Sequence, residues 1–220
     1  MPPAIGPRPI NLHIDGFRAL GADTQLEHGY VSASADRLRG ANIEFDISTV
    51  TGTENIMMAA CLAQGTTVLH NAACEPEIVF LADMLNSMGA RISGAGAKTI
   101  TIEGVKRLAP ADSTIIPDRI EAGTYMVAAA ITGGEVEIAH CNPAHLQSVI
   151  AKLREASVNV LEGEDKLLVQ GGREIKPVDI ITNPYPGFPT DMQAQMMALM
   201  SLARGSCNIT ETIFDNRFMH

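Results

Sequence analysis

The apolar positions of this chain follow two helical patterns. In one pattern, apolar residues recur at the i, i+3, i+4, i+7 spacing of an amphipathic helix, as in Ile78, Leu81, Ala82 and Leu85. The segment from Leu146 to Leu153 has the same spacing. The other pattern is apolar on almost every side, which predicts buried helices over 53–64, 121–132 and 191–204. Short apolar runs between the helices predict strands at 67–71, 99–102, 136–140 and 166–169.

These patterns repeat along the chain. The amphipathic segments end at Gly21, Gly89 and Ser157, which follow one another at intervals of 68 residues (21 to 89 and 89 to 157). Each segment begins near a proline, a residue that the first turn of a helix tolerates well. Gly21 and Gly89 fit the left-handed position at a helix C-terminus, and Ser157 departs from this pattern.

The repeated unit therefore has the order buried helix, strand, amphipathic helix and strand pair, which predicts an α/β fold. Two units are complete, at about 53–116 and 118–182, with a half unit before and a half unit after them. We expect one domain over 1–116 and another over 117–220. A repeat cut at both ends predicts a fragment, and its half units would expose apolar faces through which copies could self-associate.

Bulk composition narrows the classes of function. The 220 residues are 46% hydrophobic, with a formal net charge of -9 and a pI of about 5.1. An acidic chain has no general attraction for nucleic acid or for an anionic membrane. No segment approaches the roughly 18 consecutive apolar residues of a membrane span, and nothing resembles a signal peptide. The four cysteines form no CxxC pair, so we expect reduced thiols and a cytoplasmic protein.

Two other segments resemble ligand motifs only superficially. The run 93–99 is rich in Gly and ends in Lys98-Thr99, but a strand follows it where a phosphate loop needs a helix. A hairpin turn is favoured there. His140, Cys141 and His145 lie at a junction that the repeat places between a strand and a helix. A metal site needs three or four ligands, so we expect no metal there.

Asp118 and Glu121 open one of the apolar helices. Asp118 fits a helix N-cap, where its carboxylate accepts hydrogen bonds from free backbone N–H groups. One interpretation is a cap with a surface ion pair. The alternative is that charges beside an apolar helix line a cleft between units.

The most unusual stretch is 184–195, where three prolines and a glycine precede a helix. Thr190 and Gln193 have the spacing of a capping box, which puts Asp191 in the first turn. Asp191 is then either a structural residue of the helix start or a base that accepts a proton from a bound hydroxyl. Further along, Arg217 either pairs with Asp215 or meets an anion, and the pattern does not decide between them.

These stretches carry a resemblance to a known family. Five segments resemble signatures of the UDP-N-acetylglucosamine branch of the enolpyruvyl transferases, in order along essentially the whole chain: 5–9, 71–78, 117–124, 189–195 and 214–220. The resemblance implies two domains, each an inside-out α/β barrel of three repeated units. It also implies transfer of enolpyruvyl from phosphoenolpyruvate to the 3-hydroxyl of UDP-N-acetylglucosamine, with release of phosphate, as the first committed step of peptidoglycan synthesis. No metal or organic cofactor is implied.

The resemblance also implies roles for individual residues. Asp191 resembles the aspartate that takes the proton from the sugar hydroxyl, and Arg217 resembles an active-site arginine near it. Ile213 resembles a residue whose backbone contacts the sugar, and Asp118 and Glu121 match acids that line the cleft. The remaining expected contacts are with phosphoenolpyruvate (Arg8), with the uracil (Pro9, Ile10, Asn11 and Leu12, where Asn11 replaces a frequent aspartate) and with the diphosphate (Thr49, Val50 and Thr51).

One departure bears on activity. The catalytic cysteine of the family lies on a Gly-rich loop, and its position here is Pro3, in the run Met1-Pro-Pro-Ala4. We therefore expect the isolated chain to have negligible turnover. The alternatives are a non-catalytic remnant that binds a UDP-sugar or a partner, and a member of the shikimate branch, which the segments around Asp191 and Arg217 disfavour.

Overall fold

The computed structural model describes residues 10–172, 174–215 and 217–218. The chain divides into two compact units, Met1–Ile115 and Ile116–His220. Each unit is described by itself.

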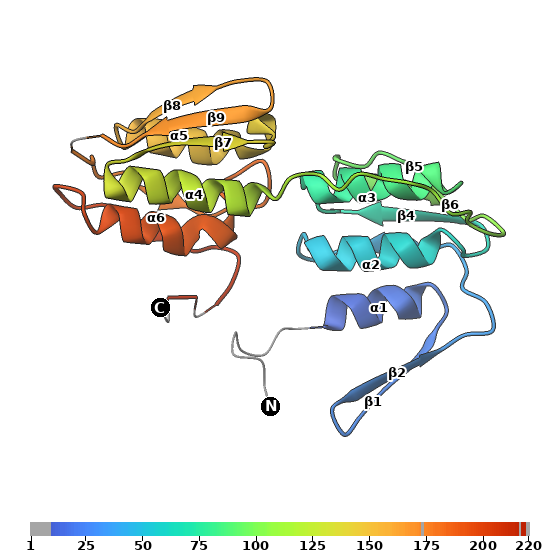
Figure 1. Cartoon of the computed structure of the whole chain (residues 1–220). Helices are drawn as coiled ribbons and strands as arrows, with labels where there is room; N and C mark the ends of the chain where they lie inside the picture. Colours follow the sequence, from blue (N-terminus) through green and yellow to red (C-terminus); the bar gives the residue numbers. More distant parts are fainter. Residues whose placement is uncertain (1–9, 173, 216, 219–220) are drawn as a thin grey trace. The chain divides into compact units, whose positions relative to one another are not determined.

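The first unit begins with a helix and a β-hairpin, followed by a four-stranded sheet with two helices (Figure 1). The sheet has the order β3-β4-β6-β5, in which β3 runs parallel to β4 and the other pairs are antiparallel. The hairpin β1-β2 forms a separate antiparallel sheet. In chain order the elements are α1 (Asn11–Ala19), β1 (Asp23–Glu27), β2 (Tyr30–Ser34), β3 (Asn42–Glu44), α2 (Val50–Ala60), β4 (Thr66–His70), α3 (Pro76–Ser87), β5 (Arg91–Ser93) and β6 (Thr99–Glu103).

The second unit begins with the succession of helices and strands that follows β3 in the first unit. An antiparallel sheet has the order β7-β9-β8, and β10 pairs in parallel with β11. The elements are α4 (Arg119–Thr132), β7 (Glu135–Ala139), η1 (Pro143–Leu146), α5 (Gln147–Glu155), β8 (Asn159–Glu162), β9 (Lys166–Gln170), β10 (Ile180–Ile181), η2 (Thr190–Met192), α6 (Gln193–Met200) and β11 (Ile209–Thr210). The predicted order of helix, strand, helix and strand pair is thus confirmed in α2-β4-α3-β5-β6 and in α4-β7-α5-β8-β9.

Two short strands were not predicted. β3 and β10 each precede a buried-helix segment and pair in parallel with the strand that follows it. Alternating burial marks both, at Ile43 and Phe45 in one case and at Val178, Ile180 and Thr182 in the other. Each run is too short to stand out from the surrounding loop residues.

The ends of the amphipathic helices repeat in conformation. Gly21 and Gly89 have φ angles of 91° and 98°, so the predicted left-handed residues are confirmed. Ser157 takes the same region with a φ of 70°, although it carries a side chain. The glycines of the 93–99 run also have positive φ (82° at Gly94 and 86° at Gly96), and they turn the chain between β5 and β6.

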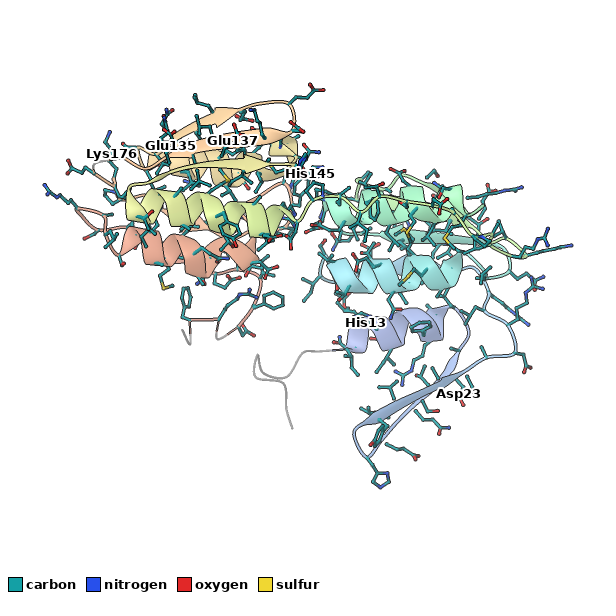
Figure 2. The ribbon with its side chains drawn as sticks, in the orientation of Figure 1. His13, Asp23, Glu135, Glu137, His145 and Lys176 are labelled. Carbon is teal, nitrogen blue, oxygen red and sulfur yellow. The ribbon has the colours of Figure 1, made fainter. Side chains whose placement is uncertain are left out.

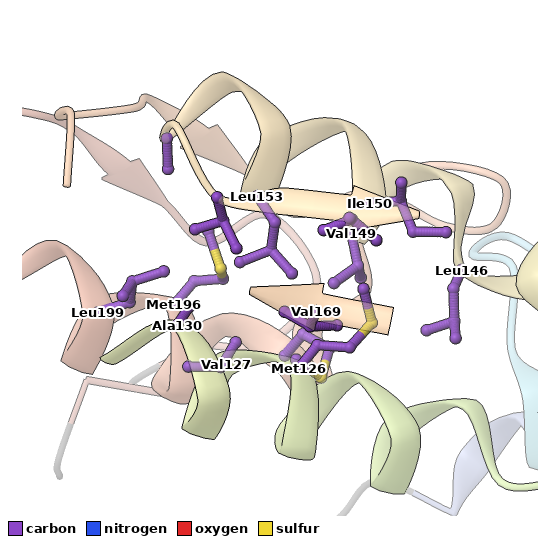
Figure 3. Close-up of a cluster of buried hydrophobic side chains, with 14 of the residues drawn as sticks. Met126, Val127, Ala130, Leu146, Val149, Ile150, Leu153, Val169, Met196 and Leu199 are labelled. Atoms are coloured by element: carbon purple, nitrogen blue, oxygen red, sulfur yellow. The ribbon is translucent and has the colours of Figure 1, made fainter. Parts of the chain in front are cut away.

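Each unit has its own apolar core. In the second unit, Met126, Val127 and Ala130 of α4 face α5 and β9 across a cluster that α6 closes with Met196 and Leu199 (Figure 3). The first unit has a separate core around Leu20, Ile56, Met57, Leu69 and Ile78.

The prediction that three helices are buried on all sides is wrong. Met58 of α2 is 45% exposed, and Leu62, just after that helix, is 48% exposed. Tyr125 of α4 is 56% exposed, and Leu202, just after α6, is 54% exposed. Each helix packs one face against the sheet and helices of its own unit, and its other face carries apolar side chains at the surface. α2 and α6 also end four residues earlier than predicted, at Ala60 and Met200.

Candidate functional site

Two of the predicted site residues form an ion pair. Nη2 of Arg217 lies 2.6 Å from Oδ1 of Asp191, although 26 residues separate them in the chain. The Asp191 side chain is 60% exposed, whereas that of Arg217 is 26% exposed. Among the described residues, Oδ2 of Asp191 has no hydrogen-bond partner, so it is open to a group arriving from solvent.

The residue pattern offered Asp215 or an anion as the partner of Arg217, and the structure shows a third partner, Asp191. The guanidinium carbon of Arg217 lies 5.1 Å from the centre of the Phe214 ring, a cation–π distance. The carboxylate that it contacts is that of Asp191, not Asp215. Ring and carboxylate together fix the orientation of the guanidinium.

The predicted capping box at the start of this helix is wrong. The N-cap of η2 is Pro189, without a side-chain hydrogen bond, and Thr190 donates to Oε2 of Glu211 at 2.8 Å. Gln193 is fully buried, and its amide has no hydrogen-bond partner among the described residues. Thr190 is thus the first residue of the helix, not its cap, and its hydroxyl joins η2 to Glu211, just after β11.

Glu211 is a residue of this region that the sequence did not single out. Its carboxylate accepts hydrogen bonds from Thr182, Thr190, Ile213 and Phe214. Burial raises the pKa of Glu211, but the hydrogen bonds lower the pKa by more than burial raises it. The pKa therefore lies below its ordinary value. Two of its donors are 21 and 29 residues away in the chain, so no local motif could reveal it.

Asp118 and Glu121 lie at the start of α4. Oδ1 of Asp118 accepts from the N–H of Ile120 at 2.7 Å and from that of Glu121 at 3.1 Å, which confirms the predicted N-cap. The Glu121 side chain lies in the first turn of α4 and is exposed.

The start of α4 is tied to the segment that carries Asp191. Nε2 of Gln195 donates to Oγ1 of Thr124 at 3.0 Å. The guanidinium of Arg119 lies 5.8 Å from the centre of the Tyr185 ring. A Cβ at Gly123 would come within 2.8 Å of the Met192 sulfur, so glycine lets η2 pack closely on α4.

The other predicted residues lie in the first unit, at the starts of α1 and α2. Thr49 is the N-cap of α2, and its hydroxyl accepts from the N–H of Gly52 at 3.2 Å. Val50 and Thr51 form the first turn of that helix. Ile10 is the N-cap of α1, followed by Asn11 and Leu12 in its first turn. Arg8 and Pro9 lie outside the described residues.

His13 brings these two helix starts together and was missed from the sequence. Its Nε2 lies 3.4 Å from Oγ1 of Thr51, and its Nδ1 lies 3.1 Å from Nδ2 of Asn55. Figure 2 shows His13 near the beginning of α1, on the side of α2. One turn further along α2 is Glu54, whose pKa is raised by burial and then by Glu77 and Glu75.

The segments that only resembled ligand sites have structural partners. Nδ1 of His140 lies 3.8 Å from Asp165, and Nε2 of His145 lies 3.0 Å from the Asn142 amide. Over the described ranges, no three His, Cys, Asp or Glu side chains are grouped as a metal would need. A hollow of about 340 Å³ lies away from the Asp191 pair, between the end of α4 and Arg204. No helix in the described part is long and apolar enough to cross a bilayer.

Comparison with solved structures shows the fold. The enolpyruvyl transferase NikO from Streptomyces tendae matches over 96% of this chain and 53% of its own, with a TM-score of 0.88 and 24% identity. An EPSP synthase from Acinetobacter baumannii matches over 92% of this chain and 48% of its own, with a TM-score of 0.62 and 21% identity. The fold is therefore that of the enolpyruvyl transferases, as predicted.

Comparison of sequences defines the family. The model of the family EPSP synthase (3-phosphoshikimate 1-carboxyvinyltransferase) matches residues 2–220. The chain belongs to this family. It is 59% identical over 217 residues to a UDP-N-acetylglucosamine 1-carboxyvinyltransferase from Geobacter metallireducens, covering 99% of this chain and 52% of the relative. Identity to such a protein from Caldanaerobacter subterraneus is 60%, with the same coverage. The chain thus spans about half the length of the curated relatives it matches.

Proposed function

We propose that this chain provides the sugar-nucleotide side of a UDP-N-acetylglucosamine 1-carboxyvinyltransferase in peptidoglycan synthesis. The observation that carries the proposal is the Asp191–Arg217 pair, which joins two segments of the chain. The identity of 59% to a relative of that name supports this choice of substrate over shikimate chemistry. A cytoplasmic location belongs to the same proposal.

In the proposed reaction Asp191 accepts the proton of the sugar 3-hydroxyl through its open Oδ2. The hydroxyl oxygen forms a bond to C2 of phosphoenolpyruvate, and the bond between C2 and the phosphate oxygen breaks, with release of inorganic phosphate. Arg217 keeps the carboxylate oriented and adds positive charge where the anionic substrate approaches. The backbone N–H of Ile213 is occupied by Glu211, which leaves its carbonyl for contact with the sugar.

The first unit contributes to binding in the same proposal. The starts of α1 and α2 lie side by side, and we propose that the N–H groups of Val50 and Thr51 and the Thr51 hydroxyl bind the diphosphate of a nucleoside diphosphate. Asn11 and Leu12 lie at the same end, where we place the uracil. Asp118 and Glu121 of the second unit are proposed to line the sugar site. We propose neither metal nor organic cofactor.

The 220 residues alone are proposed to bind the sugar nucleotide without turning it over. No cysteine occupies the position of the family's catalytic loop, where Pro3 stands. Loss of an acid catalyst typically costs about 10² to 10⁴ in rate.

Titration calorimetry with UDP-N-acetylglucosamine tests the binding. We expect Asp191→Asn to weaken the affinity by about tenfold or more, the worth of one hydrogen bond to a charged group. Asp215→Asn is the matched control, because it makes the same change at an exposed position near Arg217, and it should bind as the parent does. A folded parent that does not bind, or equal affinities for the two variants, would contradict the proposal.

Phosphate release with both substrates tests the catalytic part. We expect a rate far below that of a full-length relative measured alongside. A rate within tenfold of that relative would show that the cysteine loop is not needed and would overturn this part of the proposal.

A further inference from the structure

The Glu211 carboxylate accepts hydrogen bonds from three segments of the second unit. Its Oε1 accepts from Oγ1 of Thr182 at 3.0 Å, from the N–H of Ile213 at 2.8 Å and from the N–H of Phe214 at 3.1 Å. Its Oε2 accepts from Oγ1 of Thr190 at 2.8 Å. One carboxylate therefore joins the end of β10, the start of η2 and the turn after β11.

Two of these donors are next to the residues of the ion pair. Thr190 immediately precedes Asp191, and Phe214 lies three residues before Arg217 and also packs its ring under the guanidinium. No hydrogen bond joins Glu211 to Asp191 or Arg217 among the described residues. The hydrogen-bonded link from Glu211 to the pair therefore runs through Thr190 and Phe214.

An ionised carboxylate satisfies this set of donors with its oxygen atoms alone. All four groups donate, and an ionised glutamate offers two oxygens with about four lone-pair sites. An amide or a protonated acid would present a donor to at least one of these groups, so a threonine hydroxyl would have to turn and accept in place of donating. The hydrogen bonds also keep the acid ionised at neutral pH, because their combined effect on its pKa exceeds that of burial.

We infer that Glu211 is a positioning residue that holds Asp191 and Arg217 at the distance where they pair. A residue needed only for the turn after β11 would require the two backbone bonds to Ile213 and Phe214. The bond to Thr190 is different, since it spans 21 residues and reaches the neighbour of the proposed base. That the Asp191–Arg217 pair takes part in catalysis rests on the proposed function.

The coupling between the two side chains is measurable by NMR in the ligand-free chain. The Nε–Hε signal of Arg217, assigned with Arg217→Lys, should shift when Asp191→Asn removes its partner's charge. In a Glu211→Gln background we expect this shift to fall to less than half its parental size. Glu174→Gln is the matched control, because Glu174 is exposed and contacts Arg204 only at 3.8 Å. In that background the full shift should persist.

Equal shifts in the Glu211→Gln and Glu174→Gln backgrounds would overturn the inference. If Glu211→Gln does not fold, Thr190→Val and Thr190→Ser give the same comparison, since only serine keeps the donor to Oε2. Serine should preserve the shift and valine should reduce it at least twofold; equal responses in these two would also overturn the inference.

Calorimetry with UDP-N-acetylglucosamine on the same variants separates this inference from the proposed function. A parent that does not bind the sugar nucleotide refutes the proposed function, while the NMR shift still decides whether Glu211 holds the pair. Where the parent binds, Glu211→Gln should weaken binding by a smaller factor than Asp191→Asn does. Binding weakened equally by Glu174→Gln would contradict a specific role of Glu211.

Discussion

Two fully buried threonines allow a test of the hydrogen-bond network with one substitution. Thr182 and Thr67 both have side chains that are 0% exposed. The Thr182 hydroxyl donates to Oε1 of Glu211 at 3.0 Å and accepts from the N–H of Thr212 at 2.9 Å. The Thr67 hydroxyl, in β4, has no hydrogen-bond partner among the described residues. Replacing threonine by valine removes the hydroxyl and keeps the shape of the side chain.

The two substitutions should change stability in opposite directions. Thr182→Val removes a hydrogen bond to a charged acceptor, worth about 1.5 to 3 kcal/mol, and takes the acceptor from the N–H of Thr212, whose part-buried hydrogen bond is worth about 1 kcal/mol. We expect a net loss of about 2 to 4 kcal/mol. Thr67→Val removes a buried hydroxyl that gains nothing from its surroundings, so we expect a gain of about 1 kcal/mol.

Urea unfolding followed by hydrogen exchange measures each unit separately, because Thr67 lies in the first unit and Thr182 in the second. With a slope near 2 kcal/mol per molar urea, the loss at Thr182 should lower the midpoint of the second unit by about 1 to 2 M. The first unit should be unaffected by that change. A loss below about 0.5 kcal/mol at Thr182, or a clear loss at Thr67, would refute the reasoning.

Three further predictions concern backbone conformation, pH and thiol reactivity. Ser157→Gly should stabilise the second unit by about 0.5 to 1 kcal/mol, and Gly89→Ser should destabilise the first by about 1 to 2 kcal/mol, because both positions have positive φ; urea midpoints that move the other way would contradict this. The lowered pKa of Glu211 contributes stability that is present above the unfolded pKa and is lost as pH falls below about 4.3. The free energy of unfolding of the second unit should therefore fall less steeply with decreasing pH in Glu211→Gln than in Glu174→Gln. Identical pH curves for the two variants would contradict this prediction. Burial raises the pKa of the Cys61 thiol to about 11, so it should remain protonated and unmodified by iodoacetamide at pH 8 until urea unfolds the first unit; labelling of the folded chain at Cys61 would show that the thiol is accessible.

The elements that the sequence predicted are those with a local cause. Spacing of apolar residues located the amphipathic helices, and glycine at a fixed interval located the left-handed residues at 21 and 89. Asp118 was predicted as a cap because its partners are the next N–H groups along the chain. In each case the residues that cause the structure lie within one or two helical turns.

What the sequence did not predict depends on partners that are distant in the chain. Thr190 has the local pattern of a cap, but the helix begins one residue earlier, with Pro189 as its N-cap, and the Thr190 hydroxyl donates to Glu211, which is 21 residues away in the chain. His13 meets Thr51 and Asn55 only because α1 and α2 pack together. Arg217 pairs with Asp191 and not with Asp215, and this choice of partner likewise depends on how the turn after β11 lies over η2.

Across the repeats, backbone conformation is kept where the residues are not. Ser157 stands at the left-handed position that glycine occupies at 21 and 89. Asn71 and His140 follow equivalent strands and have φ angles of 52° and 53°, so a different side chain is held in the same conformation in each unit. A strained position that tolerates serine or histidine must be fixed by the elements on either side of it, not by the residue itself. The proposed site residues also share a backbone position but differ in their contacts. Asp118 and Asp191 begin helices that are equivalent in the repeat, yet the Asp118 carboxylate caps its own helix and the Asp191 carboxylate pairs with Arg217. The repeat supplies the helix start in both cases, and a contact from outside it, that with Arg217, distinguishes the Asp191 carboxylate from that of Asp118.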